Sequence, residues 1–176
     1  MKHLALILFV FLLIKPIFGQ ENFIVPIMTD SAKHQRVVYI MNYVMIASAN
    51  YAKQQGQSLE NYAKSFGDLA KTTWNKEAGF DGFVKGTLYN WESWRNSSNP
   101  SIKIIRQSEG FIQFTIPLDF NKWFEDGNIH DISFMNLMEM YAIMHKTIAE
   151  YLGASYEQEL ILIEDGNWIE ITIKEK

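Results

Sequence analysis

The chain has 176 residues, of which 48% are hydrophobic and 20% are charged, and its formal net charge is −4. This composition is typical of a single globular domain and excludes a disordered tail or a bundle of membrane helices. The acidic balance argues against a nucleic-acid partner, because nucleic-acid-binding proteins normally carry a basic patch. The sequence has no cysteine, which excludes disulfides, thiolate metal sites, cysteine nucleophiles and a lipidated N-terminal cysteine.

Residues 1–19 have the layout of a secretory signal peptide. A positively charged start precedes an apolar run from Leu4 to Ile14, and Gly19 is a small residue at the expected cleavage position. The run is shorter than the about 20 residues that span a bilayer, and Lys15 interrupts it. We therefore expect a cleaved signal rather than a membrane anchor. For an exported chain without cysteine we favour a bacterial periplasmic or secreted protein, with one domain over 20–176 and no membrane span after cleavage.

Two helices are expected after a short apolar lead-in. Asp30 and Ser31 are good N-cap residues for a helix that ends at Gly56, and Ser58 restarts a second helix that continues to Trp74. Apolar and small residues recur at three-to-four spacing on the first helix, which predicts one buried face: Val37, Ile40, Met41, Val44, Met45, Ser48, Ala49 and Ala52. Small residues in both helices, including Ala49, Ala63 and Gly67, are expected to let them approach closely as a hairpin.

The segment from Phe80 to Trp94 is ambiguous. Gly82 and Gly86 weaken a helix there, whereas the large side chains of the segment, such as Trp91, require a core. Both interpretations stay open at this point.

Two β-hairpins joined by a helix are predicted from Ile102 onward. The apolar period changes to two over 102–106 and 111–116, on either side of a Ser-Glu-Gly turn. Asp131 is expected to cap a helix that ends at Gly153. The strands 156–163 and 168–173 then flank the turn Glu164-Asp165-Gly166-Asn167. We therefore predict a single α+β domain, in which an N-terminal helical hairpin accompanies a four-stranded antiparallel sheet built as hairpin–helix–hairpin.

This order of elements resembles the clan that contains the 4-vinyl-reductase and haem–nitric-oxide-binding domains, including the L-2-amino-thiazoline-4-carboxylic acid hydrolase family. The string Gly56–Ala63 resembles the entry into the second helix, and Gly153–Trp168 resembles the closing hairpin. The resemblance implies an α+β fold and two possible activities, a hydrolase or a haem-based gas sensor. Relatives commonly carry cysteines where this chain has Ile116-Pro117 and Trp168-Ile169, so thiol- or metal-dependent chemistry is not carried over.

Two histidines are weak catalytic candidates. His145 lies one turn after Tyr141 on the apolar side of its predicted helix. The haem-binding relatives imply a role as an iron ligand, but a core histidine with one hydrogen bond to the backbone is the favoured interpretation. His130 precedes Asp131, a pairing that orients general bases in many enzymes. A solvated turn is the default interpretation there.

Aromatic residues suggest a ligand site. In a helix, Trp91 and Trp94 share a face beside Arg95, and this combination can bind a planar or acidic ligand through stacking and charge. We include Tyr141 and His145 in this candidate ligand-binding site. Ordinary core packing is the alternative for all the aromatic residues.

The remaining candidates favour no chemistry. Carboxylates crowd the last hairpin, but a solvated outer sheet face explains Glu157, Glu159, Glu164, Asp165 and Glu170 better than a cation site does. No phosphate-binding glycine loop or serine nucleophile motif is present. We therefore expect no metal and no cofactor. The predicted function is an exported domain that binds a small apolar or aromatic molecule or a protein partner, without evident catalytic machinery.

Overall fold

The computed structural model describes residues 28–93, 102–118, 120–163 and 166–176. The predicted signal peptide and its lead-in, Trp94, Arg95, Glu164 and Asp165 lie outside these ranges. Within them the chain forms four helices and one four-stranded antiparallel sheet, which confirms the predicted α+β domain. None of these helices has the length and apolar character needed to cross a membrane.

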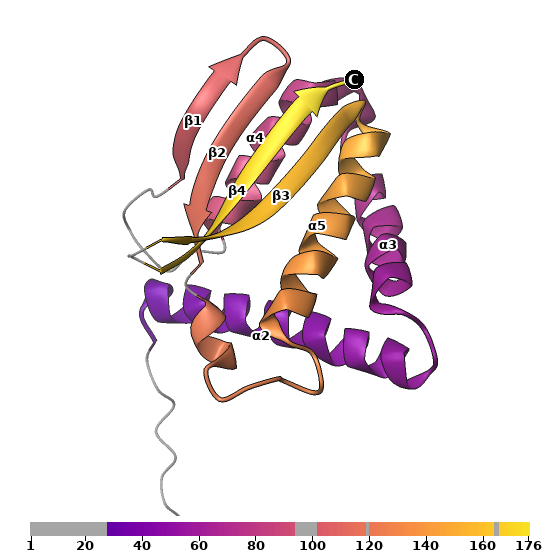
Figure 1. Ribbon diagram of the computed structural model, residues 1–176, viewed down its shortest axis with the longest axis vertical. Coiled ribbons are helices and arrows are strands. Elements are labelled where there is room, and N and C mark those ends of the chain that lie inside the picture. The colour runs from indigo at the N-terminus through magenta and orange to yellow at the C-terminus, as the bar shows by residue number, and fades with distance from the viewer. Residues whose placement is uncertain (1–27, 94–101, 119, 164–165) are drawn as a thin grey trace, which may run out of the picture.

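The elements follow one another in the predicted order (Figure 1). The helices are α2 (Asp30–Gln54), α3 (Leu59–Ala70), α4 (Gly79–Ser93) and α5 (Phe134–Tyr151), with short 3-10 turns η1 (Lys71–Thr73), η2 (Lys76–Ala78) and η3 (Phe120–Phe124). The strands are β1 (Lys103–Ser108), β2 (Phe111–Pro117), β3 (Ala154–Ile163) and β4 (Gly166–Glu175).

The sheet has the strand order β1-β2-β4-β3, so the two hairpins join through β2 and β4. These strands run antiparallel, with Phe114 opposite Ile171. Alternate residues of both strands form the buried inner face: Ile112, Phe114, Ile116, Ile169, Ile171 and Ile173. In Figure 1, α4 lies behind the sheet and α5 runs beside it. Because both helices meet Tyr156 of β3, through Phe83 and His145, they cover this inner face together.

The ambiguous segment is the helix α4, and its glycines have a packing role. A Cβ atom at Gly86 would collide with the ring of Trp74, which lies against the helix. A side chain at this position would push that ring away, so glycine is retained although it weakens the helix. The low helix propensity of glycine therefore argued against a helix in this segment, but the packing of the folded chain stabilises one there.

The cap of α5 differs from the prediction. His130 and Asp131 have φ angles of 50° and 61° and form a tight turn, closed by two backbone hydrogen bonds of 3.0 Å between Ile129 and Ile132. An N-cap residue needs an extended backbone, so Asp131 cannot cap the helix. Ser133 does so instead, in a reciprocal capping box with Asn136.

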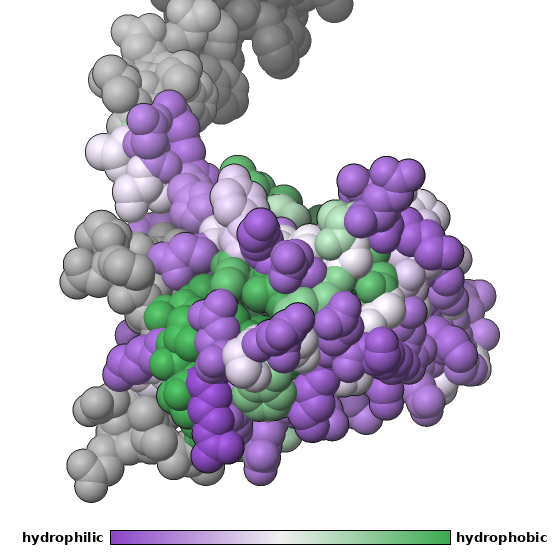
Figure 2. All heavy atoms as spheres, turned by 90° about the horizontal axis from the view of Figure 1, so that it is seen from above, coloured by the Kyte–Doolittle hydropathy of each residue, from purple (hydrophilic) through white to green (hydrophobic). Residues whose placement is uncertain are grey.

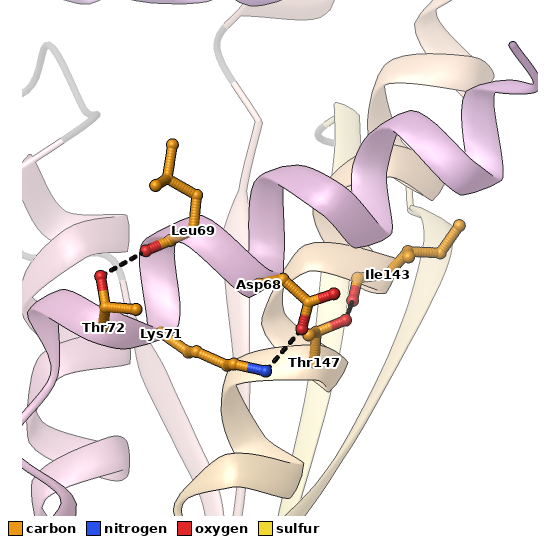
Figure 3. A network of polar contacts seen from close by, with 6 residues as sticks. All are labelled: Asp68, Leu69, Lys71, Thr72, Ile143 and Thr147. Atoms are coloured by element: carbon orange, nitrogen blue, oxygen red, sulfur yellow. Dashed lines mark hydrogen bonds and ion pairs between the residues drawn. The ribbon is translucent and has the colours of Figure 1, made fainter.

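The small residues of α3 serve its contact with α5. A Cβ atom at Gly67 would lie 2.8 Å from Cβ of Thr147 and 3.1 Å from the carbonyl oxygen of Met144. At this contact Asp68 of α3 lies beside Thr147 and forms an ion pair of 2.6 Å with Lys71 (Figure 3). Helix α2 meets α3 near their shared turn and then lies across the end of the domain (Figure 1). The close approach expected between α2 and α3 is therefore found along α3 and α5.

Candidate functional site

Three of the predicted ligand-binding residues meet in the core. The imidazole of His145 is stacked between Trp91 and Tyr156, with ring centroids 5.7 and 5.1 Å away and planes within 18° of parallel. The ring of Tyr141 meets Trp91 edge-on at 6.0 Å. Trp91, Tyr141 and His145 are each only 2% exposed. We call Trp91, Tyr141, His145 and Tyr156 the buried stack.

Hydrogen bonds fix the orientation of the buried stack. Nδ1 of His145 lies 2.8 Å from the carbonyl oxygen of Tyr141, and since a carbonyl only accepts, Nδ1 carries the hydrogen. The hydroxyl of Tyr141 donates to Oδ1 of Asn42, which is itself buried. The hydroxyl of Tyr156 donates to Gln158 over 2.8 Å. These polar groups are satisfied by the protein, as buried polar groups normally are.

Burial controls the charge states within the stack. Desolvation lowers the pKa of His145 to about 4, against the opposing effect of its hydrogen bond to Tyr141. The same burial raises the pKa values of the Tyr141 and Tyr156 hydroxyls. All three groups are therefore neutral at physiological pH. An acid or base must come within hydrogen-bond reach of its substrate, so this closed arrangement is suited to packing rather than to proton transfer.

Among the described carboxylates of the last hairpin, Glu157, Glu159 and Glu170 lie on the outer face of the sheet. Glu157 and Glu159 are exposed, and the amide of Gln113 donates to Glu170 over 2.8 Å. On the same face, Lys103 holds its ammonium 4.7 Å from the ring centre of Trp168. No group of three or more metal-ligating side chains gathers in the described ranges.

A second aromatic group lies on the exterior, where α2 meets η3. Tyr39 and Tyr43 stack one helical turn apart, with centroids 6.1 Å from each other, and Trp123 meets Tyr39 edge-on at 5.3 Å. The predicted candidate His130 joins this group, because its Nε2 lies 2.8 Å from the Tyr43 hydroxyl. Both tyrosines are 40% exposed. His130 is thus placed at the surface beside the ring of Tyr43.

A hollow of about 410 Å³ lies beside these rings. We call it the aromatic hollow, and it is lined by Met28, Ala32, Gln35, Arg36, Tyr39 and Trp123. The guanidinium carbon of Arg36 lies 5.8 Å from the ring centre of Tyr39. Among the described residues no carboxylate forms an ion pair with Arg36, so its charge faces solvent beside two aromatic rings. Stacking surface and a fixed positive charge are therefore combined in one open hollow.

The residues of the aromatic hollow were not among the sites expected from the sequence, although the spacing of several of them along α2 could have indicated a shared face. Arg36, Tyr39 and Tyr43 recur at spacings of three and four, which places them on one side of a helix. That side differs from the buried face, which carries Asn42 and Ile46. The sequence does not reveal that Trp123 joins them, because it lies 80 residues or more away along the chain.

The other end of the domain carries a different surface. A hollow of about 850 Å³ separates the start of α4 from the β1–β2 turn, and three carboxylates line it: Asp81, Glu109 and Glu175. Figure 2 looks down on this end and shows apolar side chains gathered on the side of β1. Ile104 and Ile105 of this edge strand are about half exposed. The rings of Phe80 and Phe111 also line this hollow, but its charges are carboxylates, whereas the aromatic hollow places the cation of Arg36 beside its rings.

The geometry of these sites is the available guide to function. In comparisons with protein-family models, curated proteins and solved structures, no match to this chain was found.

Proposed function

We propose that the chain is an exported binding domain that takes an aromatic, acidic molecule into the aromatic hollow. The observation that carries this proposal is that the exposed Tyr39 and Arg36 and the half-buried Trp123 surround a hollow of about 410 Å³. Small-molecule sites have volumes of about 300–1,000 Å³ and combine apolar walls with a few polar groups. The volume therefore favours a small aromatic molecule over a large protein epitope.

Each residue has a distinct role in this proposal. The rings of Tyr39 and Trp123 offer faces and edges to a planar group, and Met28 adds a flexible apolar contact. Arg36 provides a planar guanidinium that can bind a carboxylate through two parallel hydrogen bonds. This is the stacking-and-charge chemistry that the sequence suggested for Trp91, Trp94 and Arg95, carried by different residues.

Indole-3-acetate, neutral indole and acetate are suitable probes, monitored by heteronuclear NMR. We expect indole-3-acetate to bind more tightly than indole, and acetate not to bind. Trp123→Ala should weaken indole-3-acetate at least about tenfold, which corresponds to about 1.4 kcal/mol. Arg36→Gln should remove the preference for the acid while indole still binds.

Tyr89→Ala is the matched control, because Tyr89 is an exposed aromatic residue on α4, outside the hollow. Its affinity for indole-3-acetate should equal that of the wild type. Equal binding by the wild type and Trp123→Ala would contradict the proposed site. Export has its own test, since intact-mass analysis of protein recovered from the periplasm or medium should show the loss of residues 1–19.

A further inference from the structure

One face of helix α2 forms a wall of the aromatic hollow. Ala32, Gln35, Arg36 and Tyr39 line the hollow, and because they recur at spacings of three and four residues they lie side by side on the helix. Ala32 is small and leaves space one turn before Gln35 and Arg36. Trp123 of η3 extends the aromatic surface through its contact with Tyr39. A single ligand in the hollow can therefore meet a carboxamide, a guanidinium and aromatic rings together.

Gln35 is the polar group of the hollow to which the proposed function gives no role. The residue is exposed, and no hydrogen bond within the described part of the chain involves its carboxamide. A carboxamide has an oxygen that accepts and an NH₂ group that donates, whereas the guanidinium of Arg36 only donates. A peptide group, with one N–H and one C=O, is the partner that uses both sides of a carboxamide. Gln35 therefore adds a site for an amide to the sites for a ring and an acid.

We infer that the aromatic hollow binds an aromatic amino acid with a free carboxylate and an acylated amine, as at the C-terminus of a peptide that ends in an aromatic residue. This inference rests on the proposed function and names the class of ligand. Arg36 binds the carboxylate, and the rings of Tyr39 and Trp123 pack against the aromatic side chain. Gln35 pairs with the amide. In such a ligand all three groups branch from one carbon atom, as the close spacing of their partners on α2 requires.

The charges around the hollow favour an acylated amine over a free one. In the described ranges no carboxylate lines the hollow, so the ammonium group of a free amino acid would find no partner of opposite charge there. It would also lie close to the guanidinium of Arg36, which repels it. An acylated amine is neutral and avoids both costs. Because Tyr39 is 40% exposed, the hollow is open, and the acyl group or the preceding peptide can extend into solvent.

Four matched compounds test the inference by NMR titration of the full mature chain. N-acetyltryptophan carries all three groups, indole-3-propionate lacks the acetamido group, N-acetyltryptophanamide lacks the carboxylate, and tryptophan has a free amine. We expect N-acetyltryptophan to bind about tenfold more tightly than each of the others, because one net hydrogen bond corresponds to about two- to tenfold in affinity. Its two enantiomers should differ by a similar factor, since three contacts around one carbon atom select one hand.

A substitution at Gln35 identifies the residue that recognises the amide. Gln35→Leu should lower the affinity for N-acetyltryptophan to that for indole-3-propionate, because leucine has a similar size and no hydrogen-bonding group. Gln54→Leu is the matched control, since Gln54 is an exposed glutamine at the other end of α2, and it should keep the full preference for N-acetyltryptophan. Circular dichroism should confirm that both variants are folded. An unchanged preference in Gln35→Leu would overturn the role of this residue.

The peptide Gly-Gly-Trp distinguishes the two sources of this chemistry. Affinity at least equal to that of N-acetyltryptophan would identify a peptide C-terminus, and weaker binding would identify a small N-acyl amino acid. If the wild type bound N-acetyltryptophan and indole-3-propionate equally well, the inference would be overturned while the proposed function stood. If neither compound bound, and indole-3-acetate did not bind either, the proposed function would fail as well.

Discussion

The buried stack and the aromatic hollow contain the same kinds of residues in opposite surroundings. Each contains tyrosine and tryptophan rings, yet the stack closes His145 between two rings, whereas the hollow places the exposed Arg36 beside Tyr39. In the buried stack α4, α5 and β3 converge on one point, so every polar atom must find a partner within the protein. In the described part of the chain the aromatic hollow is lined by α2, by Met28 just before it and by Trp123 of η3, and Tyr39 remains 40% exposed. An aromatic ring that several elements enclose therefore packs in the core, whereas a ring that fewer elements cover can contact a ligand.

Removal of a tryptophan should separate the two regions most clearly. Trp91→Ala leaves a large cavity in the core, and we expect a loss of about 3–5 kcal/mol in the free energy of unfolding. Trp123→Ala, at the half-buried edge of the hollow, should cost less, about 1–2 kcal/mol, because only part of the ring packs against the core. Urea denaturation of both variants gives the comparison. Equal losses would show that Trp123 is a core residue and not part of a binding surface.

Acidification should destabilise the protein through the buried stack. In the unfolded chain His145 takes up a proton near pH 6.5, but in the folded chain it does so only at about pH 4. The unfolded state thus binds more protons between these values, and stability falls as the pH drops through this range, by about 3 kcal/mol in all. Below pH 4 this group adds no further loss.

The variant His145→Phe keeps an aromatic ring in the stack and has no proton to gain. Urea denaturation from neutral pH down to about pH 4 should show a shallower loss for it than for the wild type. The difference between the two curves gives the contribution of His145 alone, because carboxylates that titrate in the same pH range are present in both proteins. Parallel curves would mean that His145 accepts a proton in the folded protein as easily as in the unfolded chain.

An atom added between α3 and α5 should destabilise the folded protein. Gly67→Ala introduces a Cβ atom 2.8 Å from that of Thr147, and we expect a loss of about 1–3 kcal/mol despite the higher helix propensity of alanine. Ser65→Ala, at an exposed position of the same helix, is the control. Thermal or urea unfolding should show that Gly67→Ala is less stable than the wild type and that Ser65→Ala is slightly more stable. A stabilised Gly67→Ala variant would mean that the helices separate readily.

The smallest effect is expected at the hydrogen bond between Tyr43 and His130. Tyr43→Phe removes one exposed bond and should cost no more than about 1 kcal/mol. His130→Asn should cost a similar amount, because asparagine tolerates the left-handed backbone of this turn. A double-mutant cycle in urea should give a coupling energy within the same bound. A coupling energy above about 2 kcal/mol would show that this hydrogen bond contributes substantially to the stability of the fold.

Local patterns predicted most of the fold. The two hairpins were visible because apolar alternation matches the sheet and because Gly110, with φ of 66°, lies where a tight turn needs it. The cap of α5 was misplaced because Asp131 is chemically suited to capping, and only the tight turn that includes it makes this impossible. The helicity of α4 was undecided because the reason for Gly86 is the ring of Trp74, a contact between separate elements.

The candidate site was less predictable than the fold. Trp91, Tyr141 and His145 were grouped as a ligand-binding site, and in the structure they lie together as closed core residues. The aromatic hollow depends on Trp123 meeting Tyr39 across the fold, and nothing local indicates that contact. Val37, Ile40, Met41 and Val44 are exposed, but they were assigned to the core because the spacing of apolar residues cannot distinguish two apolar faces of one helix.

The strand order has a consequence for how the chain acquires its structure. The centre of the sheet is formed by β2 and β4, which are separated by the whole of α5 and β3. A ribosome that has made only the first hairpin has produced a strand without its main neighbour. The sheet can therefore close only after residues 166–175 have been synthesised, and its pairing is long-range and slow to form. Until then the edge of β2 that pairs with β4 keeps its backbone N–H and C=O groups unpaired, which leaves this strand open to incorrect pairing.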